Sequence, residues 1–188
     1  MSTARHPQLD ADLAALTDTQ ENAYWTADTY GNEYGWYHLR APGLLLKAAR
    51  RLAAEDARLT MITAYNKKRL TDPVQDVAYH FEVDKSILYT VTVTLDQECP
   101  AVDSITPLFS NADWHEREMH ELYAVQVNGH PNPRRLFLDE DIEEGILGEA
   151  VPLSIMMNGA CTTDLWEKIL KDRARASKKS VQNEESGI

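Results

Sequence analysis

The stretch "VAYHFEVDKSILYTVTVTL", residues 77–95, decides the fold class of this 188-residue chain. Apolar and polar residues alternate on both sides of "DKS", residues 84–86, as in strands that bury one face. Two such runs joined by a short polar turn predict an antiparallel β-hairpin. The side chains expected in the core are Val77, Tyr79, Phe81, Val83, Ile87, Tyr89, Val91, Val93 and Leu95.

The sequence before the hairpin predicts a helix between two strands. Short strands are expected over residues 36–39 and 58–66, and Pro42 suits the first turn of the helix that follows it. Strong helix formers fill residues 44–56, with apolar residues at helical spacing. The predicted buried face of this helix consists of Leu45, Ala48, Ala49 and Leu52.

After the hairpin, a helical segment is expected over residues 101–109, and an amphipathic helix is expected over residues 162–176. Between them, "VQVNGHPNPRRLFLDEDIEEG", residues 125–145, is punctuated by proline and glycine and predicts irregular structure. The whole pattern favours an α+β fold, with a small, mostly antiparallel sheet, flanking helices and an extended C-terminal docking segment. The predicted division is a flexible arm over 1–28, an α+β domain over 29–125, a partner-docking segment over 126–160, and a helix with a disordered tail over 161–188.

Composition excludes several classes of function. The net charge is −11 and the isoelectric point is near 4.9, which argues against nucleic-acid binding because phosphates attract basic surfaces. No apolar run is long enough to span a membrane, and the first 25 residues do not resemble a signal peptide. Cys99 and Cys161 lie far apart in the sequence, which favours a reduced, cytoplasmic protein. Two cysteines cannot supply the four ligands of an ordinary iron–sulfur cluster.

The stretch "NADWHEREMHELYAV", residues 111–125, gathers the candidate chemistry of the chain. A zinc-binding helix places two histidines four residues apart, about 40° around the helix axis. His115 and His120 are five residues apart, which separates them by about 140°. The di-iron motif has a glutamate three residues before its histidine, whereas this chain has Arg117 there. Metal binding is therefore not expected.

A surface helix explains much of the same stretch. Asp113 and Glu116 have the spacing of a capping box, and Arg117 and Glu121 have the spacing of an ion pair on one helix face. The sequence contains no GxSxG, GxGxxG or P-loop motif that would indicate a nucleophile or a nucleotide site. The expected apolar face consists of Met119, Leu122 and Tyr123.

Two elements resemble the 30 kDa subunit of respiratory complex I, which is also a component of bacterial NADH–quinone oxidoreductase. The first is Trp114-x-Glu116-Arg117-Glu118-Met119-His120-Glu121-Leu122-Tyr123, and the second is Gly129-His130-Pro131-Asn132-Pro133-Arg134-Arg135-Leu136. Related subunits occur in membrane-bound, energy-converting NiFe hydrogenases. The resemblance covers roughly residues 36–153.

The chain departs from the family pattern at two places. Ala124 stands where glycine is usual, and residues 143–153 contain no basic side chain where respiratory complex I has a His-Pro-Leu-Arg-Lys-Asp element. The second departure favours a hydrogenase-type or other divergent member of the family.

The resemblance implies a non-catalytic scaffold subunit, peripheral on the cytoplasmic side of the cell membrane. Such subunits hold no cofactor themselves. They pack on a catalytic large subunit and on iron–sulfur subunits. The chemistry takes place at the clusters of these partners and, in hydrogenases, at their NiFe centre. The scaffold subunits contact the membrane arm only indirectly. The alternative from a different class is a stand-alone metal-dependent hydrolase that uses the Glu/His-rich helix 114–123. His130 could bind metal or relay protons, although a loop histidine more often bonds to backbone groups. The residues expected to bind the partner are Trp114, Glu116, Arg117, Glu118, His120, Glu121, Tyr123, His130, Pro131, Arg134 and Arg135.

Overall fold

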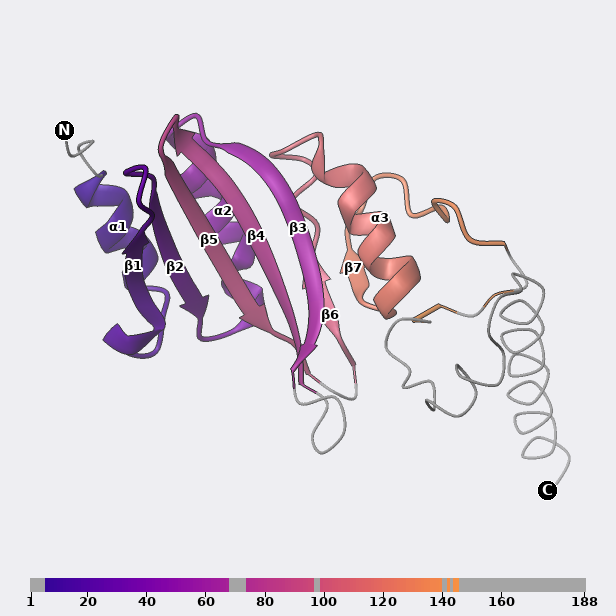
Figure 1. Ribbon diagram of the computed structural model, residues 1–188. Coiled ribbons are helices and arrows are strands. Elements are labelled where there is room, and N and C mark those ends of the chain that lie inside the picture. Colours follow the sequence, from indigo (N-terminus) through magenta and orange to yellow (C-terminus); the bar gives the residue numbers. More distant parts are fainter. Residues whose placement is uncertain (1–5, 68–73, 97–98, 140–141, 143, 146–188) are drawn as a thin grey trace, which may run out of the picture.

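A twisted five-stranded sheet, packed on one face by two helices, forms the body of the protein (Figure 1). The computed structural model describes residues 6–67, 74–96, 99–139, 142 and 144–145. The strands follow the order β1-β2-β5-β4-β3, and only β2 and β5 run parallel. The strands of this sheet are β1 (Ala23–Ala27), β2 (Glu33–Leu39), β3 (Arg58–Lys67), β4 (Val74–Asp84) and β5 (Ile87–Thr94).

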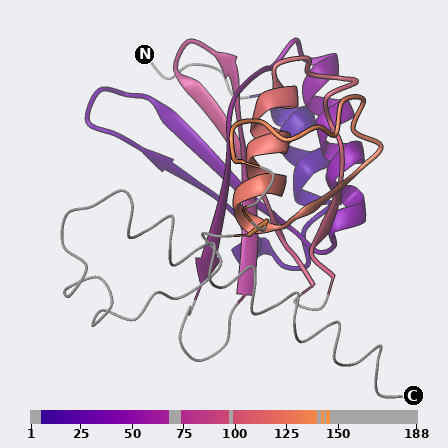
Figure 2. The same cartoon turned by 90° about the vertical axis from the view of Figure 1, so that its right-hand side faces the viewer.

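Three α-helices, two 3-10 turns and a second, two-stranded sheet complete the described structure. The helices are α1 (Pro7–Ala14), α2 (Leu45–Ala54) and α3 (Ala112–Tyr123), and the 3-10 turns are η1 (Gln20–Asn22) and η2 (Pro42–Leu44). The second sheet pairs β6 (Ala101–Asp103) with β7 (Gln126–Asn128) in parallel. Figure 2 shows the β1–β2 ribbon projecting away from the helices. The α+β fold expected from the sequence is confirmed.

The predicted hairpin is confirmed as β4 and β5. Tyr79 lies opposite Val91 and Phe81 lies opposite Tyr89, with a register shift next to the turn. The predicted core positions of the hairpin are buried except Val83, which is partly buried. Their burial stabilises the fold by about 25 cal/mol for each Å² of apolar surface removed from water.

The predicted helix after Pro42 and the strand over 58–66 are also confirmed. Pro42 begins the short 3-10 turn η2, which leads into α2. All four residues of the predicted helix face are buried, the most exposed by only 1%. This face could be predicted from the sequence because its apolar residues recur at the 3.6-residue spacing of a helix.

Two expectations about helices and strands were wrong. The flexible arm over 1–28 contains α1 and β1, and Leu9 and Leu13 of α1 are fully buried in the core. Their four-residue spacing marks one helix face, and the helix packs beside α2, whose Arg51 pairs with Asp12. The segment over 101–109 is not a helix but begins with strand β6, because its backbone pairs with β7 from beyond α3.

The predicted C-terminal helix and tail over 161–188, and most of the docking segment over 126–160, lie outside the described residues. Among the described helices, none is both long and apolar enough to cross a membrane.

Candidate interaction site around helix α3

Helix α3 carries the charged motif and is anchored at both ends. At its start, Asn111 donates its side-chain amide to the carbonyl of Leu59 on β3, at 2.8 Å. At its end, Ala124 adopts a left-handed backbone with φ of 55°. This conformation normally favours glycine, because a Cβ atom crowds the following carbonyl. The helix therefore ends in a strained non-glycine residue.

Glu116 is a buried structural carboxylate and not a helix cap. It is fully buried and accepts hydrogen bonds from Ser104 Oγ at 2.6 Å, from the Ile105 N–H at 2.7 Å and from Thr106 Oγ1 at 2.7 Å. The predicted capping box is wrong because the helix begins at Ala112, which turns Glu116 inward. Glu116 thus ties the turn after β6 to helix α3.

The negative charge of Glu116 also affects the core. Tyr79 is buried, and its pKa lies well above the ordinary tyrosine value, first because of burial and then because of the charges of Glu116 and Asp103. A buried hydroxyl beside carboxylates resists ionisation, since the second negative charge would be neither hydrated nor paired.

Glu121 holds the irregular segment that follows β7. Its side chain is buried, with 1% of the residue exposed, and accepts hydrogen bonds from the backbone N–H groups of Phe137 at 3.1 Å and Leu138 at 2.8 Å. The Glu121 backbone carbonyl also accepts a bond from the Gly145 N–H at 2.9 Å. One residue of α3 therefore fixes two distant stretches of backbone.

Two arginines bind the same segment through its carbonyl oxygens. Arg117 donates from Nε to the Arg134 carbonyl at 2.7 Å and from Nη2 to the Arg135 carbonyl at 2.6 Å. Arg135 donates to the carbonyls of Asp139 and Ile142, at 2.9 and 2.6 Å. The planar guanidinium suits such pairs of acceptors. We call Glu116, Arg117, Glu121, His130 and Arg135 the clasp.

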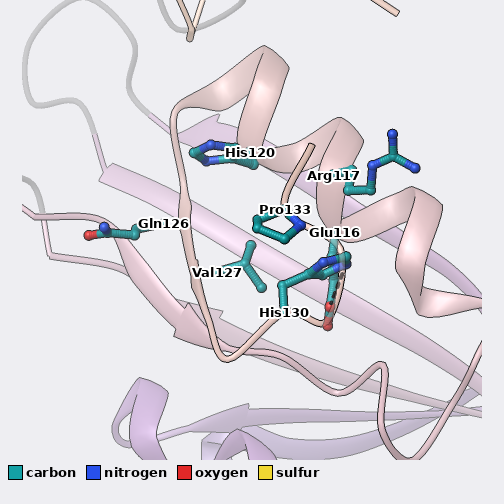
Figure 3. A pocket seen from close by; sticks show the side chains of 7 residues that line it. All are labelled: Glu116, Arg117, His120, Gln126, Val127, His130 and Pro133. Atoms are coloured by element: carbon teal, nitrogen blue, oxygen red, sulfur yellow. Dashed lines mark ion pairs between the residues drawn. The ribbon is translucent and has the colours of Figure 1, made fainter. Parts of the chain in front are cut away.

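His130 completes the clasp next to a small pocket of about 170 Å³ (Figure 3). Its side chain is 2% exposed, and its Nδ1 accepts the N–H of Asn132 at 3.0 Å. The ring proton is therefore assigned to Nε2, which lies 3.3 Å from the Asp113 carbonyl and 3.6 Å from Glu116 Oε2. His130 bonds to backbone groups, as a loop histidine commonly does.

The two histidines of the motif lie on different sides of α3. His115 lines a groove next to β3, whereas His120 donates from Nδ1 to the Val125 carbonyl at 2.9 Å and places Nε2 3.3 Å from Glu144. Within the part of the chain that the structure describes, no three potential ligands gather closely enough to hold a metal ion. The i, i+5 spacing is consistent with this separation.

The predicted partner-binding residues divide into two groups. The clasp residues and His120 bond within the chain and are at least partly buried, whereas Trp114, Glu118, Pro131 and Arg134 are accessible, Arg134 while donating to Asn132 Oδ1 at 2.8 Å, and Tyr123 is half-buried. Trp114 is the most accessible aromatic residue of α3, with 68% of its surface exposed. Met61 and Phe137, which are not among the predicted residues, are 51% and 59% exposed. Their exposure became visible only in the structure, and exposed large apolar side chains often mark contact surfaces.

The site is typical of a structural protein, because charged side chains of one motif bind backbone groups of the same chain and so fix the shape of a surface. The chain belongs to the family described as the respiratory-chain NADH dehydrogenase 30 Kd subunit, whose model matches residues 41–159. The resemblance seen in the motif is thereby confirmed. The alternative of a stand-alone metal-dependent hydrolase is not supported.

Curated relatives carry names from the same family. An NADH-quinone oxidoreductase subunit of Mesorhizobium japonicum is 41% identical over 80 residues, which cover 42% of this chain and 39% of that protein. An NAD(P)H-quinone oxidoreductase subunit of Synechococcus sp. strain CC9605 is 46% identical over 52 residues, 27% of this chain and 28% of that protein. The matched stretches therefore span less than half of these relatives.

A solved structure shares the fold. A chain in the structure of the membrane-bound sulfane sulfur reductase, an archaeal respiratory membrane complex, superposes with a TM-score of 0.55. The match covers 71% of this chain and 77% of that one, at 14% sequence identity.

Proposed function

We propose that this protein is a non-catalytic scaffold subunit in the hydrophilic arm of a membrane-bound, ion-pumping redox complex. It packs on the catalytic large subunit of either an energy-converting NiFe hydrogenase or a complex I-like NADH–quinone oxidoreductase. The observation that carries this proposal is the clasp. Glu116, Arg117 and Glu121 of the family motif form hydrogen bonds with backbone and hydroxyl groups of the chain itself. Such bonds indicate a structural role.

The clasp supports a docking role because it presents other residues outward. Arg117 and Glu121 hold the backbone of residues 134–138, in which the side chains of Phe137 and Arg134 are both exposed. Tryptophan, tyrosine and arginine are the residues that most often dominate the binding energy of protein interfaces. Ordering the segment before binding also lowers the entropy lost on association.

The chemistry of the complex is assigned to its other subunits. In this proposal the chain holds no cofactor, and the iron–sulfur clusters and any NiFe centre belong to the subunits it packs against. It lies on the cytoplasmic side of the membrane and meets the membrane arm only indirectly. The absence of basic residues over 143–153 favours the hydrogenase-type assignment.

A pull-down of the tagged chain from its native cells in mild detergent tests the proposal. Mass spectrometry should find a hydrogenase-like large subunit, iron–sulfur subunits and membrane subunits, and nickel in the eluate would select the hydrogenase type. Recovery of a solitary protein that carries its own metal would overturn the proposal.

Surface variants locate the contact. Trp114→Ala and Arg134→Ala should each lower recovery of the large subunit about tenfold, as expected for an interface hot spot. Tyr30→Ala is the matched control, because Tyr30 is 90% exposed at the tip of the β1–β2 ribbon, on a different element.

A further inference from the structure

A second concave surface lies between α3 and β3, on a different side of the helix from the pocket of Figure 3. This groove has a volume of about 380 Å³. None of the clasp residues lines it. Its lining consists of Met61, Ile62, Thr63, Ala64, His115, Glu118, Met119, Leu122 and Tyr123.

The groove runs along the edge of strand β3. Four consecutive residues, 61–64, line it, although alternate side chains of a strand point to opposite faces of the sheet. Consecutive residues can share a groove only where the strand is presented by its edge. β3 is the last strand in the sheet order, so among the described strands no neighbour pairs with that edge.

Edge strands offer backbone N–H and C=O groups to an added strand. One such carbonyl, that of Leu59, is already bonded by the side chain of Asn111. Next to it, helix α3 forms the second wall of the groove. An edge strand beside a helix is an arrangement by which folded domains bind extended peptides, with backbone bonds for affinity and side-chain pockets for specificity.

The side chains of the groove indicate what it would bind. Met61 and Leu122 supply an apolar surface, on which Met61 is 51% exposed, whereas Met119 is buried. Among the described residues that line the groove, Glu118 alone carries a fixed charge, and its side chain is 47% exposed, 4.0 Å from His115. The chain as a whole carries a net charge of −11. Charge complementarity therefore favours an occupant with a basic side chain.

We propose that the groove binds an extended segment of a neighbouring subunit, added as a strand along β3. An apolar side chain of that segment packs between Met61 and Leu122, and a lysine or arginine pairs with Glu118. This inference rests on the proposed function, because it assigns one contact within the assembly. It is separate from the clasp surface that carries Trp114 and Arg134.

Photo-crosslinking in the assembled complex tests the groove. Benzoylphenylalanine is placed at Met61 and, as a matched control, at Tyr30, since both positions are exposed. A crosslink from position 61 to a peptide of another subunit that contains apolar and basic residues, with none to that peptide from position 30, supports the proposal. A crosslink to this chain's own residues 146–188 overturns it.

Charge reversal provides the second measurement. Glu118→Lys should lower the crosslink yield about tenfold, and a lysine- or arginine-to-glutamate change in the crosslinked peptide should restore it. Glu118→Gln should have a smaller effect, and thermal unfolding of each variant checks that the chain remains folded. If the complex assembles but position 61 forms no crosslink, the groove proposal alone is wrong. If no complex assembles around the wild-type chain, both proposals are wrong.

Discussion

Arg117 and Glu121, one turn apart on helix α3, do not pair with each other but bind opposite groups of the same distant backbone. Arg117 donates to the carbonyls of Arg134 and Arg135, and Glu121 accepts from the N–H groups of Phe137 and Leu138. Four peptide groups that have no strand or helix partner are thereby satisfied. This accounts for how an irregular segment remains ordered against the helix.

Removing the charge of Glu121 should loosen the segment. In Glu121→Gln, an amide group can accept at only one atom, so one partly buried N–H loses its partner, and we expect a loss of about 1 kcal/mol in unfolding free energy. Urea unfolding measures this loss, and hydrogen exchange should accelerate at Phe137 and Leu138. The control is Glu118→Gln, whose more exposed carboxylate should contribute little. Equal effects of the two substitutions would contradict the assigned role of Glu121.

Glu116 should matter more than Glu121, since it is fully buried and serves three donors. Glu116→Ala leaves Ser104 Oγ, the Ile105 N–H and Thr106 Oγ1 without their acceptor and opens a cavity. We expect a loss of about 3–5 kcal/mol in unfolding free energy, from buried groups without partners and lost packing. Chemical denaturation measures it. A loss below that of Glu121→Gln would show that the turn after β6 does not depend on Glu116.

The strained end of α3 predicts a stabilising substitution. Ala124 has φ of 55°, so Ala124→Gly should raise the unfolding free energy by about 0.5–1 kcal/mol, the relief of strain outweighing the greater freedom of glycine when unfolded. Gly145→Ala should act in the opposite direction, because Gly145 has φ of 83° and an added Cβ would lie 2.9 Å from the Ala124 Cβ. Calorimetry of both single variants and the double variant measures these effects. The double variant should recover part of the loss, since the clash disappears with the Ala124 side chain.

Two buried tyrosines predict a loss of stability at alkaline pH. Burial, followed by the hydrogen bond to Asp10, raises the pKa of Tyr89, and burial raises that of Tyr79. The folded state therefore holds these protons more tightly than the unfolded state does. Their stabilisation is complete below the ordinary tyrosine pKa of about 10 and decreases as the pH rises above it, by up to about 1.4 kcal/mol per pH unit for each group.

Urea unfolding of the wild type and of Tyr89→Phe, between about pH 8 and pH 11, measures this effect. The variant loses the 2.7 Å bond to Asp10 and should start less stable, but its stability should fall less steeply with pH. Identical slopes for the two proteins would exclude Tyr89 as a source of the alkaline sensitivity.

Short-range patterns predicted the body of the fold. The alternation over 77–95 and the helical spacing of Leu45, Ala48, Ala49 and Leu52 depend on contacts whose direction follows from the backbone geometry alone. Helix α1 was missed because its face is short, with Leu9 and Leu13 as its fully buried residues, and is stabilised only by distant parts of the chain, including α2, whose Arg51 bonds to Asp12. Strand β6 was missed because its partner, β7, follows it by more than 20 residues.

For the site, the sequence by itself determined the motif, the presence of helix α3 and the family to which the chain belongs. Only the tertiary structure decided which charged residues face inward. Spacing along the helix paired Arg117 with Glu121 and Asp113 with Glu116, but the groups that Glu116, Arg117 and Glu121 meet come from residues 104–106 and 134–138, and Asp113 lies beside His130. A buried charge requires partners from whatever backbone surrounds it, and that backbone is assembled from distant parts of the chain.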